Sequence, residues 1–192
     1  EVLLKLFARD GVACFSRLNG IFAAAFWEQD TGLLTLVRDP VGVKPLYIAE
    51  SADGLAFASE MKGLLRSGAV RPDLDPQAVL AHLGFLWSPG RATLVKGVRK
   101  VLPGHVIQAK AGRIISDKSF RALRFHQLPT PGSEIAAAHA VEVAVRTAVE
   151  RQMVSDVPLG AFLSGGLDSS AVAAFAQQHR QKEGAGVSGR LQ

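Results

Sequence analysis

The sequence is poor in cysteine: Cys14 is the only one among its 192 residues. A single thiol cannot form an internal disulfide, so the chain does not belong to the disulfide-stabilised secreted class, and we expect a cytoplasmic protein. Cys14 lies in the stretch Ala13-Cys14-Phe15. We expect it to be a buried structural thiol and not a nucleophile.

Long hydrophobic runs are also missing. The longest, such as residues 21–27, is far shorter than the roughly 18 residues that a membrane-spanning helix needs, so we expect no membrane partner. The first residues lack the basic start and small-residue cleavage site of a signal peptide. Position 1 is Glu and not Met, and we expect the sequence to be the interior of a longer protein.

No block of one charge stands out. The 22 Lys and Arg exceed the 17 Asp and Glu, for a net charge of +5, but they are spread along the chain, so we expect no nucleic-acid partner. The composition, 48% hydrophobic and 20% charged, is that of a globular protein. The five histidines show no metal-ligand spacing and are expected at the surface or in the core; they are His82, His105, His126, His139 and His179.

The first part of the chain predicts β-hairpins. Apolar segments come in pairs, each joined by a turn that contains Gly, and such pairs imply an antiparallel sheet. Their ranges are 20–27 with 33–38, 46–49 with 55–59, and 101–110 with 113–116. Helices are predicted at residues 2–7, at 61–65, and after Asp75-Pro76, where Asp75 can cap the helix.

Residues 128–133, Leu-Pro-Thr-Pro-Gly-Ser, break every periodic pattern and predict a linker between a domain of residues 1–127 and one of residues 134–192. After it, residues 134–151 predict an amphipathic helix, residues 157–163 a short buried strand, and residues 170–179 another helix. A helix, a strand, a Gly-rich turn and a helix typically open a doubly wound α/β domain.

The Gly-rich turn Ser164-Gly165-Gly166-Leu167-Asp168-Ser169-Ser170 carries the chemistry. Adjacent glycines let the backbone approach a ligand, and hydroxyls beside a helix N-terminus favour an anion such as phosphate. Asp168 would repel bare phosphate, so a nucleotide with Mg²⁺ fits better. The alternative is an ordinary strand-to-helix turn with a serine cap. A Walker loop is excluded, because Gly166 and Leu167 stand where Lys and Ser/Thr are required, and we read the G-x-G-x-x-G pattern at residues 184–189 as chance.

This loop resembles the pyrophosphate-binding loop of the ATP pyrophosphatase superfamily, which includes the asparagine synthetases. Upstream stretches resemble, in order, the second half of the class II glutaminase domain of asparagine synthetase. They are residues 17–23, 38–47, 58–62 and 102–105, and residues 155–160 resemble the entry to its synthetase domain.

The resemblance implies an α+β followed by an α/β fold: the antiparallel-sheet second half of an Ntn-type glutaminase domain, then the start of a doubly wound parallel-sheet domain. It implies ATP and Mg²⁺ as cofactors, glutamine and aspartate as substrates, and a possible homodimer. The implied residues for ATP and pyrophosphate are Leu163, Ser164, Gly165, Gly166, Leu167, Asp168, Ser169 and Ser170. Asp168 is the implied metal contact, and the Leu163 backbone would lie near adenine.

The implied reaction is the glutamine-hydrolysing, ATP-dependent conversion of aspartate to asparagine through an acyl-adenylate. In that family the glutaminase nucleophile is a cysteine at the mature N-terminus. No such cysteine stands in this sequence, so we assign no catalytic residue. Two alternatives stay open: a related amidotransferase acting on another carboxylate, from a cell-surface polymer or a natural product, and a catalytically inactive nucleotide-binding module.

Overall fold

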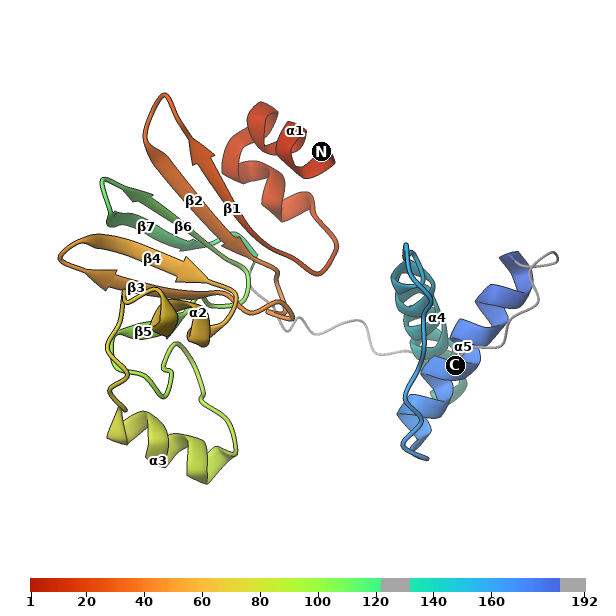
Figure 1. Cartoon of the computed structure of the whole chain (residues 1–192). Helices are drawn as coiled ribbons and strands as arrows, with labels where there is room; N and C mark the ends of the chain where they lie inside the picture. Colours follow the sequence, from red (N-terminus) through yellow and green to blue (C-terminus); the bar gives the residue numbers. More distant parts are fainter. Residues whose placement is uncertain (122–131, 184–192) are drawn as a thin grey trace. The chain divides into compact units, whose positions relative to one another are not determined.

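The computed structural model describes residues 1–121 and 132–183 (Figure 1). The chain divides into a first unit, Glu1–Arg124, and a second unit, Phe125–Gln192. Most of the predicted linker, residues 128–133, lies outside the described residues, and so does the G-x-G-x-x-G pattern at residues 184–189. Among the described residues, no helix is both long enough and apolar enough to span a bilayer.

The first unit contains two antiparallel sheets. Sheet A has the order β1-β2-β6-β7 and sheet B the order β4-β3-β5. The strands are β1 (Ala23–Glu28), β2 (Leu33–Arg38), β3 (Tyr47–Ser51), β4 (Gly54–Ala58), β5 (Val98–Lys100), β6 (His105–Lys110) and β7 (Arg113–Ser119). All three predicted hairpins are confirmed, but β1–β2 and β3–β4 belong to different sheets. The sequence did not predict β5.

These sheets form the middle of a four-layer arrangement. In β2, Val37 packs with Phe15 of the 3-10 helix η1 (Gly11–Arg17), whereas Leu36 packs with Ile48 of sheet B. Because neighbouring side chains of a strand point to opposite faces, both faces of β2 are buried. Helix α1 (Val2–Asp10) lies with η1 on the outer face of sheet A, and α2 (Met61–Arg66) packs on sheet B through Leu64 (Figure 1).

A buried aspartate organises the loop that joins β2 to β3. Asp39 is 1% exposed, and its Oδ1 accepts hydrogen bonds from the amides of residues 41, 42 and 43 at 3.1, 2.7 and 3.1 Å. Its Oδ2 accepts from the amide of Lys44 at 3.0 Å. Burial by itself would raise the pKa of Asp39, but the four amide donors outweigh it, so the pKa is lowered.

The neighbouring guanidinium ties the same loop to a distant strand. Arg38 donates to the carbonyls of Lys44, Gly42 and Val101, each at 2.7 Å. The Asp39 backbone donates to Phe22 O at 2.8 Å, and its carbonyl accepts from Gly104 N at 2.9 Å. Residues 38–39 are thus bonded to Phe22, to the loop after them and to the segment from Val101 to Gly104. Both side chains brace the turn through hydrogen bonds to backbone groups.

Strand β6 begins later than the sequence predicts. We expected a strand from residue 101, but β6 begins at His105. Val101 N instead bonds to Leu46 O of the segment entering sheet B, at 2.9 Å. Gly104 then adopts φ +68°, and a Cβ there would collide with the carbonyl oxygen of Arg121. The chain therefore crosses from one sheet to the other at this glycine, where no strand can continue.

Helix α3 (Pro76–Phe85) projects from the first unit. Asp75 caps it, as predicted, by accepting from the amides of Gln77 and Ala78 at 3.0 and 3.2 Å. Ala78 is its only buried residue. Large apolar side chains of this helix and the residues after it are exposed, and we call them the apolar lobe: Leu80, Leu83, Phe85, Leu86 and Trp87.

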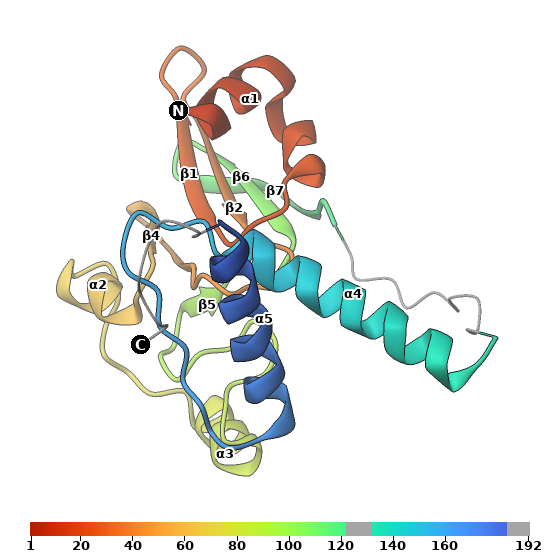
Figure 2. The same cartoon turned by 90° about the vertical axis from the view of Figure 1, so that its right-hand side faces the viewer.

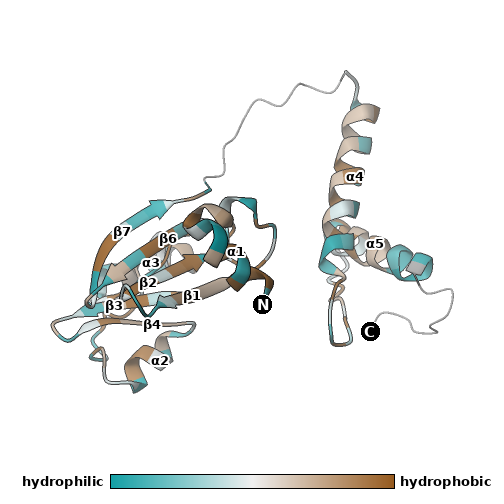
Figure 3. Cartoon of the chain, turned by 90° about the horizontal axis from the view of Figure 1, so that it is seen from above, coloured by the Kyte–Doolittle hydropathy of each residue, from teal (hydrophilic) through white to brown (hydrophobic). Residues whose placement is uncertain are grey.

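The second unit is built on two helices. Helix α4 (Glu134–Gln152) is capped by Ser133, which accepts from the Ala136 amide at 3.2 Å. Helix α5 spans Leu167–Glu183. Arg146 joins the two helices, because its guanidinium donates to Gln178 at 2.5 Å and lies 4.4 Å from the Phe175 ring centroid. Figure 3 shows that both helices carry a mixture of apolar and polar residues.

Substitution of Gly104 by Ala should destabilise the first unit, since the left-handed backbone is strained for Ala and the added Cβ meets Arg121 O. We expect the free energy of unfolding to fall by about 2 kcal/mol or more, measured by chemical denaturation. Gly20→Ala is the matched control, because a Cβ there meets no atom within 4 Å. Equal stability of the two variants would contradict this account.

Substitution of Asp39 by Asn should lower the free energy of unfolding by about 1–3 kcal/mol, because the new NH₂ group and the Lys44 amide are both hydrogen-bond donors and face each other.

The lowered pKa of Asp39 also predicts how the stability of the first unit depends on pH. The contribution of the ionised Asp39 carboxylate to the free energy of unfolding is complete above the ordinary aspartate pKa, near 4. It is lost as the pH falls below that value and through the lower pKa of the folded state. Unfolding measured from pH 7 to pH 2 should show a weaker acid dependence in Asp39→Asn than in Asp53→Asn, whose site is exposed.

Candidate functional site

The Gly-rich loop precedes helix α5 but does not follow a strand. We predicted a buried strand at residues 157–163, yet the structure has no strand between residues 153 and 166. A strand needs hydrogen-bonded neighbours, and the described part of the second unit contains only α4 and α5. Phe162 and Leu163 are accordingly exposed.

The helix after the loop begins earlier than predicted. We expected it at residue 170, but α5 starts at Leu167, immediately after the glycine pair. Gly165 has φ +78° and open space where a Cβ would be, so the sharp turn requires glycine and the backbone stays accessible there. Asp168 therefore lies in the first turn of the helix.

Three serine hydroxyls gather around the Gly166 peptide. Ser164 Oγ lies 3.0 Å from Ser169 Oγ and accepts from Gly166 N at 3.4 Å. Ser169 and Ser170 both direct their hydroxyls to Gly166 O, at 3.1 and 2.8 Å. The sequence predicted that these hydroxyls cluster with the glycines. It did not predict that they bond to one another and to the loop itself.

The donor set of this loop fits a polyphosphate. The first amides of a helix have no acceptor within the helix, and the helix dipole adds partial positive charge at this end. Hydroxyls and amides are donors that phosphate oxygens accept. Asp168 is exposed, and a carboxylate beside phosphate suits Mg²⁺, which commonly takes one or two carboxylates together with phosphate oxygens and water.

The described residues provide no preformed metal cage for this ion. Within residues 1–121 and 132–183 there is no group of three or more His, Cys, Asp or Glu side chains that could hold a metal. Mg²⁺ would have to arrive with the phosphates and contact Asp168. Leu163 and Leu167, the two other predicted contacts, expose apolar side chains, so only their backbone groups could serve a phosphate or an adenine.

An apolar groove of 360 Å³ lies between α4, α5 and residues 159–161. Its lining includes Val145, Val149, Leu159 and Val172. None of the described residues that line it is charged, and so it does not suit a phosphate.

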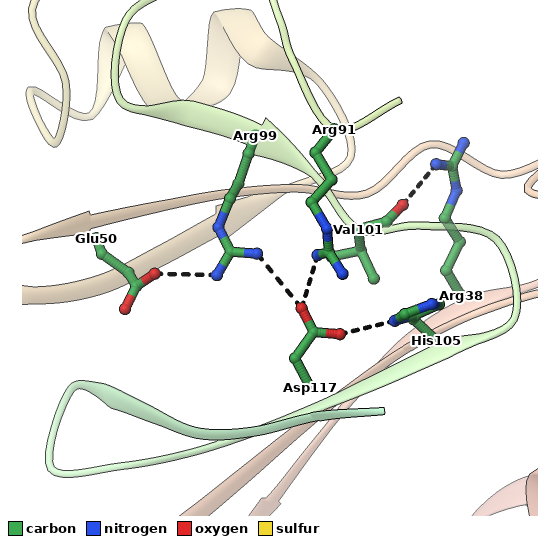
Figure 4. Close-up of polar contacts among 7 residues, drawn as sticks. All are labelled: Arg38, Glu50, Arg91, Arg99, Val101, His105 and Asp117. Carbon is green, nitrogen blue, oxygen red and sulfur yellow. Dashed lines mark hydrogen bonds and ion pairs between the residues drawn. The ribbon is translucent and has the colours of Figure 1, made fainter. Parts of the chain in front are cut away.

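The first unit contains a charge cluster that sequence reasoning missed (Figure 4). Asp117 of β7 accepts from Arg91 at 2.6 Å and from Arg99 of β5 at 3.4 Å, and its other oxygen lies 2.7 Å from His105 Nδ1. Arg99 also pairs with Glu50 of β3 at 3.0 Å. Burial would raise the pKa of Asp117, but its bonds to Arg91 and His105 outweigh burial and lower it.

This cluster connects the two sheets, because β6 and β7 belong to sheet A while β3 and β5 belong to sheet B. Both carboxylates of the cluster, Asp117 and Glu50, have an arginine partner within hydrogen-bond distance. We therefore interpret it as a structural brace between sheets. No spacing rule could have found it, since Asp117 is 26 residues from Arg91 in the chain and only the fold brings them together.

Cys14 is fully buried, as the sequence predicts. It lies in the cluster of Phe7, Phe15 and Phe26. Burial raises the pKa of its thiol, and the nearby Asp10 carboxylate raises it further. A protonated and inaccessible thiol is unsuited to nucleophilic attack.

Two family models match the chain, one in each of its two units. A family model described as "Glutamine amidotransferase domain" matches residues 1–120. A second, described as "Asparagine synthase", matches residues 140–190. The first covers the two-sheet unit and the second contains the Gly-rich loop.

Curated relatives show the same similarity along nearly the whole chain. Asparagine synthetase [glutamine-hydrolyzing] 3 of Bacillus subtilis is 34% identical over 190 residues, which are 96% of this chain and 30% of the relative. A putative asparagine synthetase [glutamine-hydrolyzing] of Mycobacterium tuberculosis is 34% identical over 188 residues, 95% of this chain and 29% of the relative. Amidase chyE of Penicillium rubens is 31% identical over 176 residues, 90% of this chain and 25% of the relative.

The chain thus spans about a third or less of the length of these relatives. Its match to the amidotransferase model nevertheless covers more than half of its own residues, and the asparagine synthase match lies later in the chain, over residues 140–190. The chain therefore belongs to the glutamine amidotransferase family, with the asparagine synthetases that join this domain to an asparagine synthase domain.

Proposed function

We propose that this chain is part of a glutamine-hydrolysing asparagine synthetase, a carbon–nitrogen ligase that uses glutamine as its amide donor. The observation that carries the proposal is the serine-lined Gly165-Gly166 turn at the start of α5, inside the segment that matches asparagine synthase. The substrates would be glutamine, aspartate and ATP with Mg²⁺, in the cytoplasm.

In this proposal the loop holds the pyrophosphate part of ATP. The amides that follow Gly165, with the hydroxyls of Ser164, Ser169 and Ser170, would donate to phosphate oxygens. Asp168 would contact Mg²⁺ bound to the same phosphates. The hydroxyls now bonded to Gly166 O and to each other would exchange those bonds for bonds to phosphate, so little reorganisation of the backbone is required.

The chemistry that such a site supports is activation of a carboxylate. A carboxylate oxygen of aspartate attacks the α-phosphorus of ATP, and pyrophosphate leaves with the electron pair of the broken P–O bond. Ammonia from glutamine then attacks the acyl carbon, loses a proton and displaces AMP. Donors aimed at the departing pyrophosphate stabilise the charge that develops on it.

The proposal includes a doubly wound parallel sheet in the asparagine synthase domain. Its support is the Gly-rich turn followed by α5 inside the segment that matches asparagine synthase, since such a turn before a helix N-terminus is typical of that fold.

A second candidate is a related amide-forming enzyme with another acceptor carboxylate. The similarity to Amidase chyE and to Amidase chry2 of Gibberella zeae favours it. The protein that contains this chain, supplied with ATP, Mg²⁺, glutamine and aspartate, distinguishes the two. Asparagine and pyrophosphate should form in equal amounts, and absence of asparagine with an active glutaminase would support the alternative acceptor.

Substitution of Asp168 by Ala should weaken binding of Mg²⁺-ATP to the chain by about tenfold, which is about 1.4 kcal/mol, because one metal contact is lost. Isothermal titration with ATP at saturating Mg²⁺ measures this. Binding of ATP in EDTA should be much less affected.

The matched control is Asp156→Ala, an exposed aspartate of the same unit outside the loop. It should bind Mg²⁺-ATP as the unaltered chain does. Equal weakening in both variants would indicate a general effect of charge and would count against a metal contact at Asp168. If the unaltered chain does not bind Mg²⁺-ATP, the purely structural reading of the loop would be supported.

The chain by itself should release no glutamate from glutamine, because its one cysteine is buried and its thiol pKa is raised. A coupled glutamate assay measures this. Modification of Cys14 by a thiol reagent should be slow in the native protein and fast in denaturant. Glutamate release that disappears in Cys14→Ala would overturn the structural reading of this thiol.

A further inference from the structure

We propose that Asn19 and Gly20 form a self-modifying site, at which the Gly20 amide nitrogen attacks the Asn19 side chain and releases ammonia. Asn19 is the only asparagine of the chain, and a glycine follows it directly. The pair lies between η1, which ends at Arg17, and β1, which begins at Ala23. Figure 2 shows this connection as a length of coil that leads from the first helices to sheet A. The inference is independent of the proposed enzymatic function.

The reaction is an intramolecular acyl transfer that forms a cyclic imide. The Gly20 nitrogen loses its proton and bonds to Asn19 Cγ, while the bond from Cγ to the side-chain nitrogen breaks and that nitrogen leaves as ammonia. Water then adds to one of the two ring carbonyls. Opening at one carbonyl gives aspartate, and opening at the other gives isoaspartate, in which the main chain runs through the side-chain carboxyl carbon. Only water is consumed.

The residue after the asparagine controls whether the ring can close, because its side chain crowds the attacking nitrogen. Gly20 has no side chain and a wide choice of backbone conformations. A Cβ at this position would meet no atom within 4 Å, so the described residues leave room for the ring. Among residues 1–121 and 132–183, no backbone carbonyl accepts from Gly20 N. This nitrogen therefore gives up no such hydrogen bond when it reacts.

The Asp-Gly pairs of the chain could form the same imide by loss of water, but they are held in place. These pairs are residues 10–11 and 53–54. In the first, the glycine N–H donates to Phe7 O. In the second, the glycine pairs with Ser51 in the β3–β4 hairpin. An ionised carboxylate is also a poorer electrophile than a neutral amide, and aspartate is ionised at neutral pH.

The modification matters to the fold because the connection is fixed at both of its ends. Leu18 packs on the core cluster of Phe15, and its N–H donates to Phe15 O at 3.2 Å. Phe22 packs on the same cluster, and its carbonyl accepts from Asp39 N at 2.8 Å. An isoaspartate at position 19 adds a carbon to the main chain between these two fixed points. One of them must then shift, so we expect the modified first unit to be less stable.

Incubation of the full 192-residue chain, and of the protein that contains it, tests the proposal. Peptide mapping by mass spectrometry should show Asn19 converted to a mixture of aspartate and isoaspartate, with one ammonia released per chain. The net charge of the chain, +5 at pH 7, should fall by one unit, which ion exchange detects. The rate should rise with pH above neutrality, because the attacking nitrogen must lose its proton.

Gly20→Ala is the variant that isolates the ring closure. It should slow the conversion at least about tenfold, because the new Cβ crowds the attacking nitrogen. The free energy of unfolding should stay near that of the unaltered chain, since this Cβ meets no other atom of the described residues. Asn19→Gln keeps a side-chain amide but would need a larger ring, and it should stay unconverted over the same period.

Chemical denaturation of the separated products tests the effect on the fold. The isoaspartate form should have a lower free energy of unfolding than the unmodified chain, whereas Asn19→Asp, which keeps the length of the main chain, should be nearly as stable. Equal stability of the isoaspartate form and Asn19→Asp would overturn the proposed effect.

Three outcomes would overturn the site itself. Conversion at an equal rate in Gly20→Ala would mean direct hydrolysis by water and not ring closure. An Asn19 that stays intact in the folded chain, while the free peptide of residues 15–24 converts, would mean that the fold blocks the reaction. Conversion in the chain but not in the protein that contains it would exclude the site from the protein.

Discussion

The first unit depends on one buried carboxylate. Asp39 accepts four backbone amides, and the adjacent Arg38 donates to three carbonyls. Together they satisfy the polar groups of a loop that would otherwise be costly to bury, since an unpaired buried amide or carbonyl costs about 1–3 kcal/mol. Because Val101 and Gly104 bond to the same pair, this loop also determines where the chain passes from sheet B to sheet A.

The sheets that meet at this junction are held by two different kinds of force. Leu36, Ile48 and Ile107 bury apolar surface between them, which is not directional. The cluster around Asp117 adds directional contacts between β7, β6 and sheet B (Figure 4). Apolar packing supplies most of the free energy, and the charge cluster restricts how the sheets can slide, because a displaced partner would leave Asp117 half-buried without a cation.

The second unit is different in character. Among its described residues, Ala176 is the only buried apolar residue, at 5% exposure, and the loop expected to bind phosphate is exposed. Its conformation comes from local rules: a left-handed glycine, hydroxyls that bond to the nearest carbonyl, and a helix that starts as soon as the glycines end. Such a loop can be arranged by a short stretch of chain, whereas a strand before it would require hydrogen-bonded neighbours.

The sequence by itself determined the features that depend on near neighbours in the chain. Contacts over a few residues determine the hairpins, the Asp75 cap of α3 and the glycine turn before α5. The hydrophobic character of its neighbours predicts that Cys14 is buried. The family resemblance likewise rests on short strings of residues and agrees with the two family matches. Tertiary structure decided the rest. Groups far apart in the chain determine the division of the hairpins between two sheets, the crossing at Gly104 and the Asp117 cluster. They also determine whether residues 157–163 form a strand. A local sequence pattern contains no information on which distant residues will become neighbours.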